Sequence, residues 1–240
     1  VVPMTNHHYI VFGGSRGIGL EITRQLVKLN HRVTVVSRSA DQISGLDGVA
    51  HMPLDITRED MASISMPEEI QGLVYCPGSI RLRPFQRLKP DDFMADMEIN
   101  LLGAVKAIQA CLPSLKRSET PGSIVLFSTV AVQTGMPFHA AIASAKGAVE
   151  GLTRSLAAEF APKIRVNAIA PSLTDTDLAR TLLSDEGKRS AAAGRHPLKR
   201  FGHAGDIAAA AIFLLEGSSS WITGQVMGVD GGMSAVRTFK

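Results

Sequence analysis

Cysteines, aromatic residues and long apolar runs are all scarce in this chain. Its 240 residues include two cysteines, which are too few for a disulfide framework and whose spacing fits no metal site. They predict free thiols in a reducing compartment, the cytoplasm, and no bound metal. No apolar run approaches the ~20 residues that cross a bilayer, so no membrane association is expected.

Strong net charge is also missing. The 25 Lys and Arg residues are scattered among 22 acidic residues, aromatic residues make up 5% of the chain, and the formal net charge is +3. A nucleic-acid-binding protein normally concentrates its basic residues in a patch or stripe, so no nucleic-acid partner is predicted. A site for an anionic small ligand accounts equally well for the pI of about 9.0.

What the chain does have is a regular alternation of strands and helices. It has no low-complexity linker and no internal repeat, and its length suits one α/β domain, residues 1–240. Continuous Val- and Ile-rich runs are typical of a parallel sheet covered on both faces. The pattern predicts a Rossmann-like, doubly wound, three-layer fold. Strands are expected at 8–12, 32–37, 50–54, 72–76, 123–128, 165–170 and 225–229, and helices at 18–30, 91–110, 140–160 and 206–215.

A glycine-rich turn separates the first predicted strand from the first predicted helix. Glycines allow tight turning and close approach of the backbone to a pyrophosphate, and a helix N-terminus offers free N–H groups to the same anion. The strand before and the helix after favour a dinucleotide site over an ordinary turn. The residues expected to bind the cofactor here are Gly13, Ser15, Arg16, Gly17, Ile18 and Gly19.

The residues that follow the second predicted strand indicate which dinucleotide binds. An NAD site usually has an acidic residue there for the ribose hydroxyls. This chain has Ser37, Arg38 and Ser39 instead. A guanidinium can hold a 2′-phosphate through two parallel hydrogen bonds, and Arg16 could approach the same phosphate. The sequence therefore predicts NADP(H) in preference to NAD(H), unless Arg38 merely projects into solvent.

Together with motifs further along, the glycine loop resembles that of the short-chain dehydrogenase/reductase family. These motifs are Asn100 in INLLG, Lys146 in ASAKGA, the run RVNAIAPSLTDT and the C-terminal ITGQVMGVDGG. The resemblance covers nearly the whole chain, and the bacterial 3-oxoacyl-carrier-protein reductase and sugar or alcohol dehydrogenase branches look nearest. It implies a Rossmann-type oxidoreductase. It also implies a homotetramer or homodimer built partly on the helix that carries Lys146.

The resemblance further implies roles for single residues. In the family a lysine holds the nicotinamide ribose, an asparagine supports a water chain and a serine orients the substrate carbonyl. Lys146 and Asn100 match the first two, and Thr129 keeps a hydroxyl at the serine position, with Ser128 beside it. Thr176 matches the family's carboxamide contact, although it could equally cap the helix that follows. Further cofactor contacts are implied at Asp55, Gly78, Lys146 and Pro171.

The family's tyrosine, which exchanges a proton with the substrate oxygen, is absent. Its position is occupied by Ile142, and the two tyrosines of the chain, Tyr9 and Tyr75, lie far from it in the sequence. Isoleucine has no exchangeable proton, and loss of a positioned acid or base typically costs ~10²–10⁴-fold in rate. The retained residues are therefore better evidence for cofactor binding than for turnover.

His139 is a candidate replacement for the missing proton donor. It lies three residues before Ile142, near the start of the same predicted helix, and residues at this spacing share a helix face. A histidine can donate a proton near neutral pH. The alternatives are a partly exposed histidine without a chemical role, and a proton supplied by Thr129, Ser128 or a bound water.

Residues 177–197 are polar and weakly periodic, and the resemblance implies a mobile lid over the substrate. Basic residues there would favour an anionic substrate or carrier, unless they form a solvated helix face. They are Arg180, Lys188, Arg189 and Arg195.

Two functional hypotheses follow. The first is an atypical NADP(H)-dependent oxidoreductase that transfers hydride between the nicotinamide and a small carbonyl or alcohol substrate. Its catalytic residues would be Asn100, Thr129, Lys146 and His139. The second is a non-catalytic NADP(H) sensor or scaffold that kept the pocket after losing the tyrosine.

Overall fold

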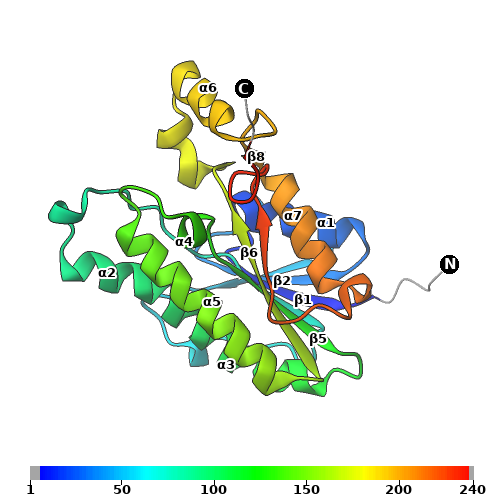
Figure 1. Ribbon diagram of the computed structural model, residues 1–240. Coiled ribbons are helices and arrows are strands. Elements are labelled where there is room, and N and C mark those ends of the chain that lie inside the picture. The colour runs from blue at the N-terminus through cyan, green and yellow to red at the C-terminus, as the bar shows by residue number, and fades with distance from the viewer. Residues whose placement is uncertain (1–5, 238–240) are drawn as a thin grey trace.

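The computed structural model describes residues 6–237, so the ends of the predicted 1–240 domain lie outside the described part. Seven parallel strands form the central sheet in the order β3-β2-β1-β4-β5-β6-β9, with helices on both faces (Figure 1). This confirms the predicted Rossmann-like fold. The strands are β1 (His8–Phe12), β2 (Arg32–Ser37), β3 (Val49–Pro53), β4 (Gly72–Tyr75), β5 (Gly122–Phe127), β6 (Ile164–Pro171) and β9 (Val226–Val229).

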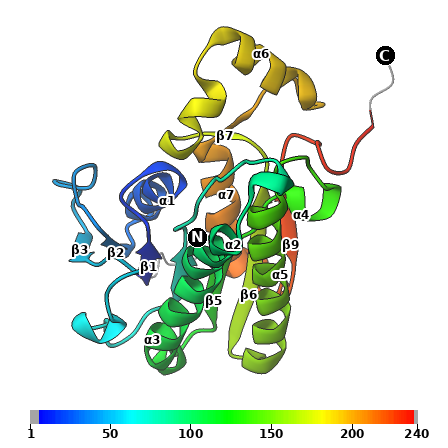
Figure 2. The ribbon, with the colours of Figure 1, turned by 90° about the vertical axis from the view of Figure 1, so that its left-hand side faces the viewer.

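Burial on both faces explains the continuous apolar runs of the central strands. Every residue of β4 and β5 is buried. Helices α1 (Gly17–Lys28) and α7 (Ala204–Leu215) cover one face, and α3 (Gly103–Arg117) and α5 (Ala140–Phe160) cover the other (Figure 2). Burial of one leucine or isoleucine side chain contributes about 1.5–3 kcal/mol to the free energy of unfolding. The two hydrophobic cores, one on each face of the sheet, therefore supply much of the stability.

The predicted helix over 91–110 is longer than expected and is not one regular helix. It consists of α2 (Pro90–Met97), a π-helical turn (Glu98–Leu102) and α3. The wider π turn changes which side chains face inward, and such turns are frequent at functional sites. Asn100 lies in this turn with its side chain buried, 1% exposed. The remaining predicted boundaries lie within two residues of the observed ones, and those of β1, β2 and α5 coincide with them.

The predicted lid segment is structured and stands beyond the carboxyl end of β6. It contains a 3₁₀ helix (Asp177–Leu183) and α6 (Glu186–Arg195), which Figure 1 shows at the top of the molecule. The short strands β7 (Thr174–Asp175) and β8 (Gly202–His203) pair with each other and fasten the two ends of the segment together. Within residues 6–237, no helix has the length and apolarity needed to cross a membrane.

The sheet order reverses between β1 and β4, each of which is followed by a loop at its carboxyl end. In open α/β sheets the ligand crevice lies at such a reversal. The glycine loop after β1 and the segment after β4 therefore meet where a dinucleotide site is expected.

Candidate active site

The backbone of the glycine loop requires glycine at specific positions. Gly13 and Gly17 have positive φ angles of 72° and 54°, a region that other residues rarely adopt. A Cβ at Gly19 would lie 2.3 Å from the carbonyl oxygen of Gly13, so no side chain fits there. Thr23 donates hydrogen bonds to the carbonyl oxygens of Gly14 (3.2 Å) and Gly19 (2.9 Å) and ties the loop to α1. No role for Thr23 was predicted from the sequence.

The N-terminus of α1 is available to an anion. Arg16 occupies the cap position, and no side chain of the described residues caps the helix there. The first-turn N–H groups of a 12-residue helix thus face the space above the loop, with the positive end of the helix dipole. This arrangement of unpaired N–H groups suits an anion, and binding of a pyrophosphate by Ser15, Ile18 and the three glycines stays a prediction.

Arg38 lies exposed at the end of β2, and Arg16 is 3.6 Å from the carboxylate of Asp41. Asp55 follows β3 at the same edge. Hydrogen bonds from the Thr57 side chain and backbone, aided by the charge of Arg38, hold the pKa of Asp55 below its usual value although burial opposes this. Cationic and hydrogen-bonding groups therefore gather at this edge of the sheet.

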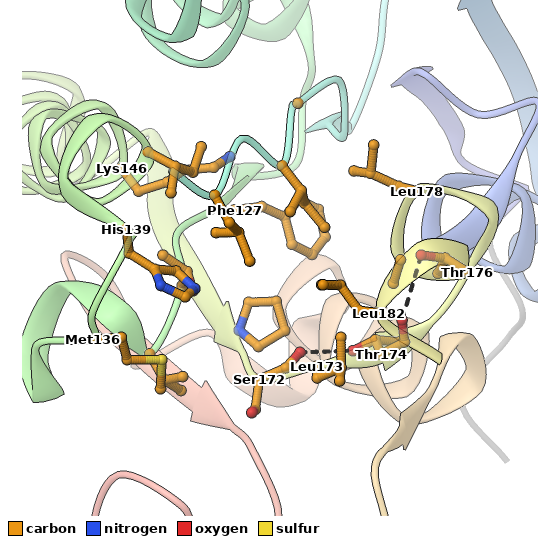
Figure 3. A pocket seen from close by; sticks show the side chains of 18 of the residues that line it. Phe127, Met136, His139, Lys146, Ser172, Leu173, Thr174, Thr176, Leu178 and Leu182 are labelled. Atoms are coloured by element: carbon orange, nitrogen blue, oxygen red, sulfur yellow. Dashed lines mark hydrogen bonds between the residues drawn. The ribbon is translucent and has the colours of Figure 1, made fainter. Parts of the chain in front are cut away.

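A cavity of about 860 Å³ extends from Ile18, at the start of α1, to three of the four predicted catalytic residues (Figure 3); Asn100, the fourth, does not line it. Its wall includes Ile18 and Gly78 near the loop, and Pro171 and Thr176 after β6. The side chain of Thr176 lies 3.5 Å from the position of a Cβ on Gly17, so the lid segment touches the glycine loop. Thr129, His139, Ile142 and Lys146 line the same cavity.

Lys146 is buried in the wall of this cavity, 9% exposed. Burial lowers its pKa to about 8, although Asp96, and Cys76 when it is a thiolate, oppose this change. Figure 3 shows the side chain reaching from α5 toward the loop after β4. Burial also raises the pKa of the Cys76 thiol to about 12, so this neighbour is neutral near pH 7.

The two hydroxyls at the end of β5 have different surroundings. Ser128 donates a hydrogen bond to the buried carboxylate of Glu150 at 2.7 Å, so its proton is not available to a ligand. Thr129 accepts a long hydrogen bond (3.3 Å) from the Ala131 N–H and keeps its own proton available on the cavity wall. Both hydroxyls line the cavity, and Thr129, at the position implied by the resemblance, is the one whose proton is not donated to a described residue.

His139 immediately precedes α5 and contributes to the cavity wall. Its Nδ1 lies 2.8 Å from the carbonyl oxygen of Pro137, which can only accept a hydrogen bond. Nδ1 therefore carries a proton, and Nε2 is the ring nitrogen left for other partners. Ile142, one turn further along α5, is 5% exposed and presents only hydrocarbon to the cavity.

The structure adds a serine–histidine pair that the sequence reasoning did not find. His196, which is 2% exposed, lies with Nε2 2.8 Å from Ser172 Oγ and Nδ1 2.7 Å from the Ala192 carbonyl oxygen. These contacts join the end of α6 to the segment after β6. The two residues are 24 positions apart, and no periodic pattern indicates that they meet.

The basic residues of the lid have different roles. Arg180 pairs with Asp177, and Arg189 pairs with Asp175 at 3.0 Å and covers the ring of Phe201. Lys188 and Arg195 line the large cavity. The expected cationic lid is therefore partly a set of surface ion pairs and partly a cavity wall.

Comparison with known proteins agrees with this geometry. Residues 13–234 match the family described as Enoyl-(Acyl carrier protein) reductase. The chain is 34% identical to the 3-oxoacyl-[acyl-carrier-protein] reductase of Bos taurus over 235 residues, which cover 93% of this chain and 96% of that protein. The chain belongs to the short-chain dehydrogenase/reductase family. A mycobacterial 3-oxoacyl-[acyl-carrier-protein] reductase, from Mycobacterium tuberculosis H37Rv, is 32% identical over 238 residues, with 96% and 94% of the two chains covered.

Solved structures of the short-chain dehydrogenase/reductase family superpose on nearly the whole chain. The aldohexose dehydrogenase of Thermoplasma acidophilum matches with a TM-score of 0.87 and 29% identity, covering 99% of this chain and 98% of that one. A gluconate 5-dehydrogenase from Burkholderia cenocepacia, solved with NADP and tartrate, matches with a TM-score of 0.85 and 27% identity over 96% of each chain. These relatives are oxidoreductases, and the family binds a nicotinamide cofactor.

Proposed function

We propose that the protein is an atypical NADP(H)-dependent oxidoreductase that interconverts a small carbonyl compound and its alcohol. This proposal rests on one observation: Thr129 and Lys146 line the same cavity as Ile18 of the glycine loop. Bound NADP(H) would supply or accept the hydride. The glycine loop and the N-terminus of α1 would hold the pyrophosphate, Lys146 would hold the nicotinamide ribose, and Asn100 would support a water chain.

Thr129 would donate a hydrogen bond to the substrate oxygen, where negative charge develops as the carbonyl is reduced. Residue 142 cannot supply the accompanying proton, so another group of the cavity must do so. His139, predicted from the sequence, is one candidate. Asp55, Gly78, Pro171 and Thr176 would complete the cofactor site.

Thr129→Ala is expected to lower kcat for carbonyl reduction about 10²-fold, because removal of one oxyanion donor typically costs this much. The affinity for NADPH, measured by fluorescence titration, should stay unchanged. Thr134→Ala is the matched control, since it removes an exposed hydroxyl five residues further along the chain. Equal rates for Thr129→Ala and the native protein would exclude Thr129 as the oxygen ligand.

The proposed NADP(H) preference depends on Arg38. Arg38→Ala is expected to raise the Kd for NADPH about 10- to 100-fold, because a charge-assisted hydrogen bond contributes about 1.5–3 kcal/mol. The Kd for NADH should change little. Arg24→Ala, which removes an exposed cation from α1, is the control. A parallel loss of affinity for both dinucleotides would contradict a 2′-phosphate contact at Arg38.

The absence of an acid at residue 142 also supports a second candidate, a sensor or scaffold that binds NADP(H) without turnover. The cavity and cradle are the same in this case, and Thr129→Ala would have no activity to lower. For either function we propose a cytoplasmic homo-oligomer, a tetramer or dimer that uses α5. The cytoplasmic location rests on the two free cysteines, Cys76 and Cys111.

A further inference from the structure

A buried histidine holds a serine hydroxyl on the wall of the large cavity. His196, directly after α6, is 2% exposed, and its Nε2 lies 2.8 Å from Ser172 Oγ. Its Nδ1 lies 2.7 Å from the carbonyl oxygen of Ala192. His196 and Ser172 both line the cavity that Thr129 lines, and Figure 3 shows Ser172 on its wall. The polarity of this pair therefore bears on what the cavity accepts.

The contacts of His196 fix the direction of its hydrogen bond with Ser172. A carbonyl oxygen only accepts, so the proton of the neutral ring is on Nδ1, and Nε2 is left as an acceptor. Ser172 Oγ also lies 3.0 Å from the Met233 sulfur, but a thioether is the weaker acceptor. Ser172 therefore donates its one proton to His196 Nε2.

The acidic residues around His196 agree with a neutral ring. Within residues 6–237 no carboxylate oxygen lies within 4.0 Å of a His196 nitrogen, so no ion pair holds a second proton on the ring. Asp230, which interacts electrostatically with His196, accepts hydrogen bonds from the N–H groups of Gly232 at 2.8 Å and Ser234 at 2.9 Å. A charge on a buried ring without a paired partner is costly.

Ser172 thus has acceptor capacity and no free proton. A hydroxyl group has one proton and two lone pairs, and none of the described residues donates a hydrogen bond to Ser172 Oγ. Thr129 has the opposite state, because it accepts from the Ala131 N–H and keeps its proton. The cavity wall therefore presents one hydroxyl that can donate and another that can accept.

The two hydroxyls come from neighbouring strand ends. The Val130 N–H donates to the carbonyl oxygen of Pro171 at 3.2 Å, so the segment after β5 stays beside the end of β6. Thr129 immediately precedes this donor, and Ser172 immediately follows this acceptor. Neighbouring parallel strands are roughly 4.8 Å apart, so a substrate only a few bonds long can contact both hydroxyls.

Large apolar side chains make up much of the remaining cavity wall. They include Phe127, Met136, Ile142, Leu178, Leu182 and Met233. A ligand hydroxyl that leaves water for such a cavity needs a partner there, because a buried hydroxyl without a hydrogen bond is costly. An acceptor at Ser172 therefore selects ligands that carry a hydroxyl group.

We propose that Ser172, held by His196, is a specificity-determining hydrogen-bond acceptor, and that the substrate is a hydroxyketone whose hydroxyl group lies one or two carbons from the carbonyl group. This inference rests on the proposed oxidoreductase function. Thr129 donates to the carbonyl oxygen, and the substrate hydroxyl donates to Ser172 Oγ. In the opposite direction the substrate is the corresponding diol.

Matched ketones test this assignment by steady-state oxidation of NADPH. Hydroxyacetone and butanone have the same number of non-hydrogen atoms and differ in a hydroxyl against a methyl group, and 4-hydroxy-2-butanone and 2-pentanone form a second pair. The native protein should prefer the hydroxyketone of at least one pair. In Ser172→Ala the kcat/KM for that hydroxyketone should fall about 5-fold, the equivalent of about 1 kcal/mol, while the value for the matched simple ketone stays unchanged.

Ser190→Ala is the control variant, since Ser190 is exposed on α6 and does not line the cavity. A thermal unfolding curve shows whether each variant remains folded. Equal losses for both ketones of a pair in Ser172→Ala would mean that Ser172 only fastens α6, and would overturn the acceptor role. Methoxyacetone, which has the oxygen but no proton to donate, should be reduced no better than butanone, and a preference for it would also overturn that role.

The ring nitrogens of His196 give a readout without turnover. In cofactor-free protein labelled with ¹⁵N at histidine, in mildly alkaline buffer, the His196 signals should show a proton on Nδ1 and a bare Nε2. They are assigned by their absence in His196→Gln. A proton on Nε2, or on both nitrogens, would free the Ser172 hydroxyl to donate and would overturn the acceptor role.

The outcomes separate the two proposals. Turnover by the native protein without a preference for either hydroxyketone would overturn this inference and leave the oxidoreductase function standing. If no ketone is turned over, the proposed function fails, and ligand-observed NMR with NADP⁺-loaded protein then compares the binding of hydroxyacetone and butanone. A preference for hydroxyacetone that is lost in Ser172→Ala would leave the acceptor role standing, and equal binding would overturn it as well.

Discussion

Replacement of Ile142 by tyrosine is expected to raise kcat for carbonyl reduction about 10²-fold, since a positioned general acid typically contributes ~10²–10⁴-fold. The new phenol would lie one helical turn from Lys146, on the wall of a cavity of about 860 Å³. The neighbouring positive charge would lower the phenol pKa from its usual value of about 10 toward the working pH. The measurement is steady-state oxidation of NADPH at saturating cofactor.

Ile142→Phe is the matched control for this gain. It adds the aromatic ring without the hydroxyl, so it should leave kcat at or below the native value. Equal gains from both variants would mean that the ring acts through packing. No gain from tyrosine, in a variant that stays folded and binds NADPH, would mean that the substrate oxygen does not lie where residue 142 can reach it.

Gly19→Ala is expected to abolish measurable NADPH binding and to lower the free energy of unfolding by about 3 kcal/mol. The added methyl group would lie 2.3 Å from the carbonyl oxygen of Gly13 and 3.1 Å from the Cα of Gly14. Because these neighbours are backbone atoms, the whole loop must move. The pyrophosphate cradle is then lost together with the packing of the loop on α1.

Denaturant unfolding and NADPH titration measure both effects. Gly205→Ala is the control, because a Cβ at this α7 position meets no atom within 4 Å. It should bind NADPH as the native protein does, with equal or slightly higher stability. Native-like affinity in Gly19→Ala would show that the loop is not the pyrophosphate site.

The fold could be predicted from the sequence because each main strand is marked by a pattern within a few consecutive residues. Uninterrupted Val- and Ile-rich runs predicted β1, β2 and β5 within one residue of their observed bounds. The π turn at Glu98–Leu102 was not predicted, since its apolar pattern is compatible with a regular helix and tertiary packing decides the difference. Helix α6 was missed as a defined element because most of its residues are polar or small and face outward.

Single motifs were enough to predict residues that the structure brings to one cavity, namely Ile18 of the glycine loop, Thr129 and Lys146, while their roles stay predictions. The candidate site was not predictable where residues distant in sequence meet. Asp96 and Ser79, which are joined by a hydrogen bond, gave no signal in the sequence. The pair formed by Ser172 and His196 likewise depends on the path of the lid.

The central claim is that this cavity performs hydride transfer without a tyrosine. The most direct test follows oxidation of NADPH by the native protein, with NADH beside it, across a panel of ketones, diketones and 3-oxoacyl thioesters. The account predicts turnover of at least one carbonyl class, with NADPH preferred over NADH. Tight NADPH binding without turnover of any substrate, and activity that emerges only in Ile142→Tyr, would contradict it and favour a sensor or scaffold.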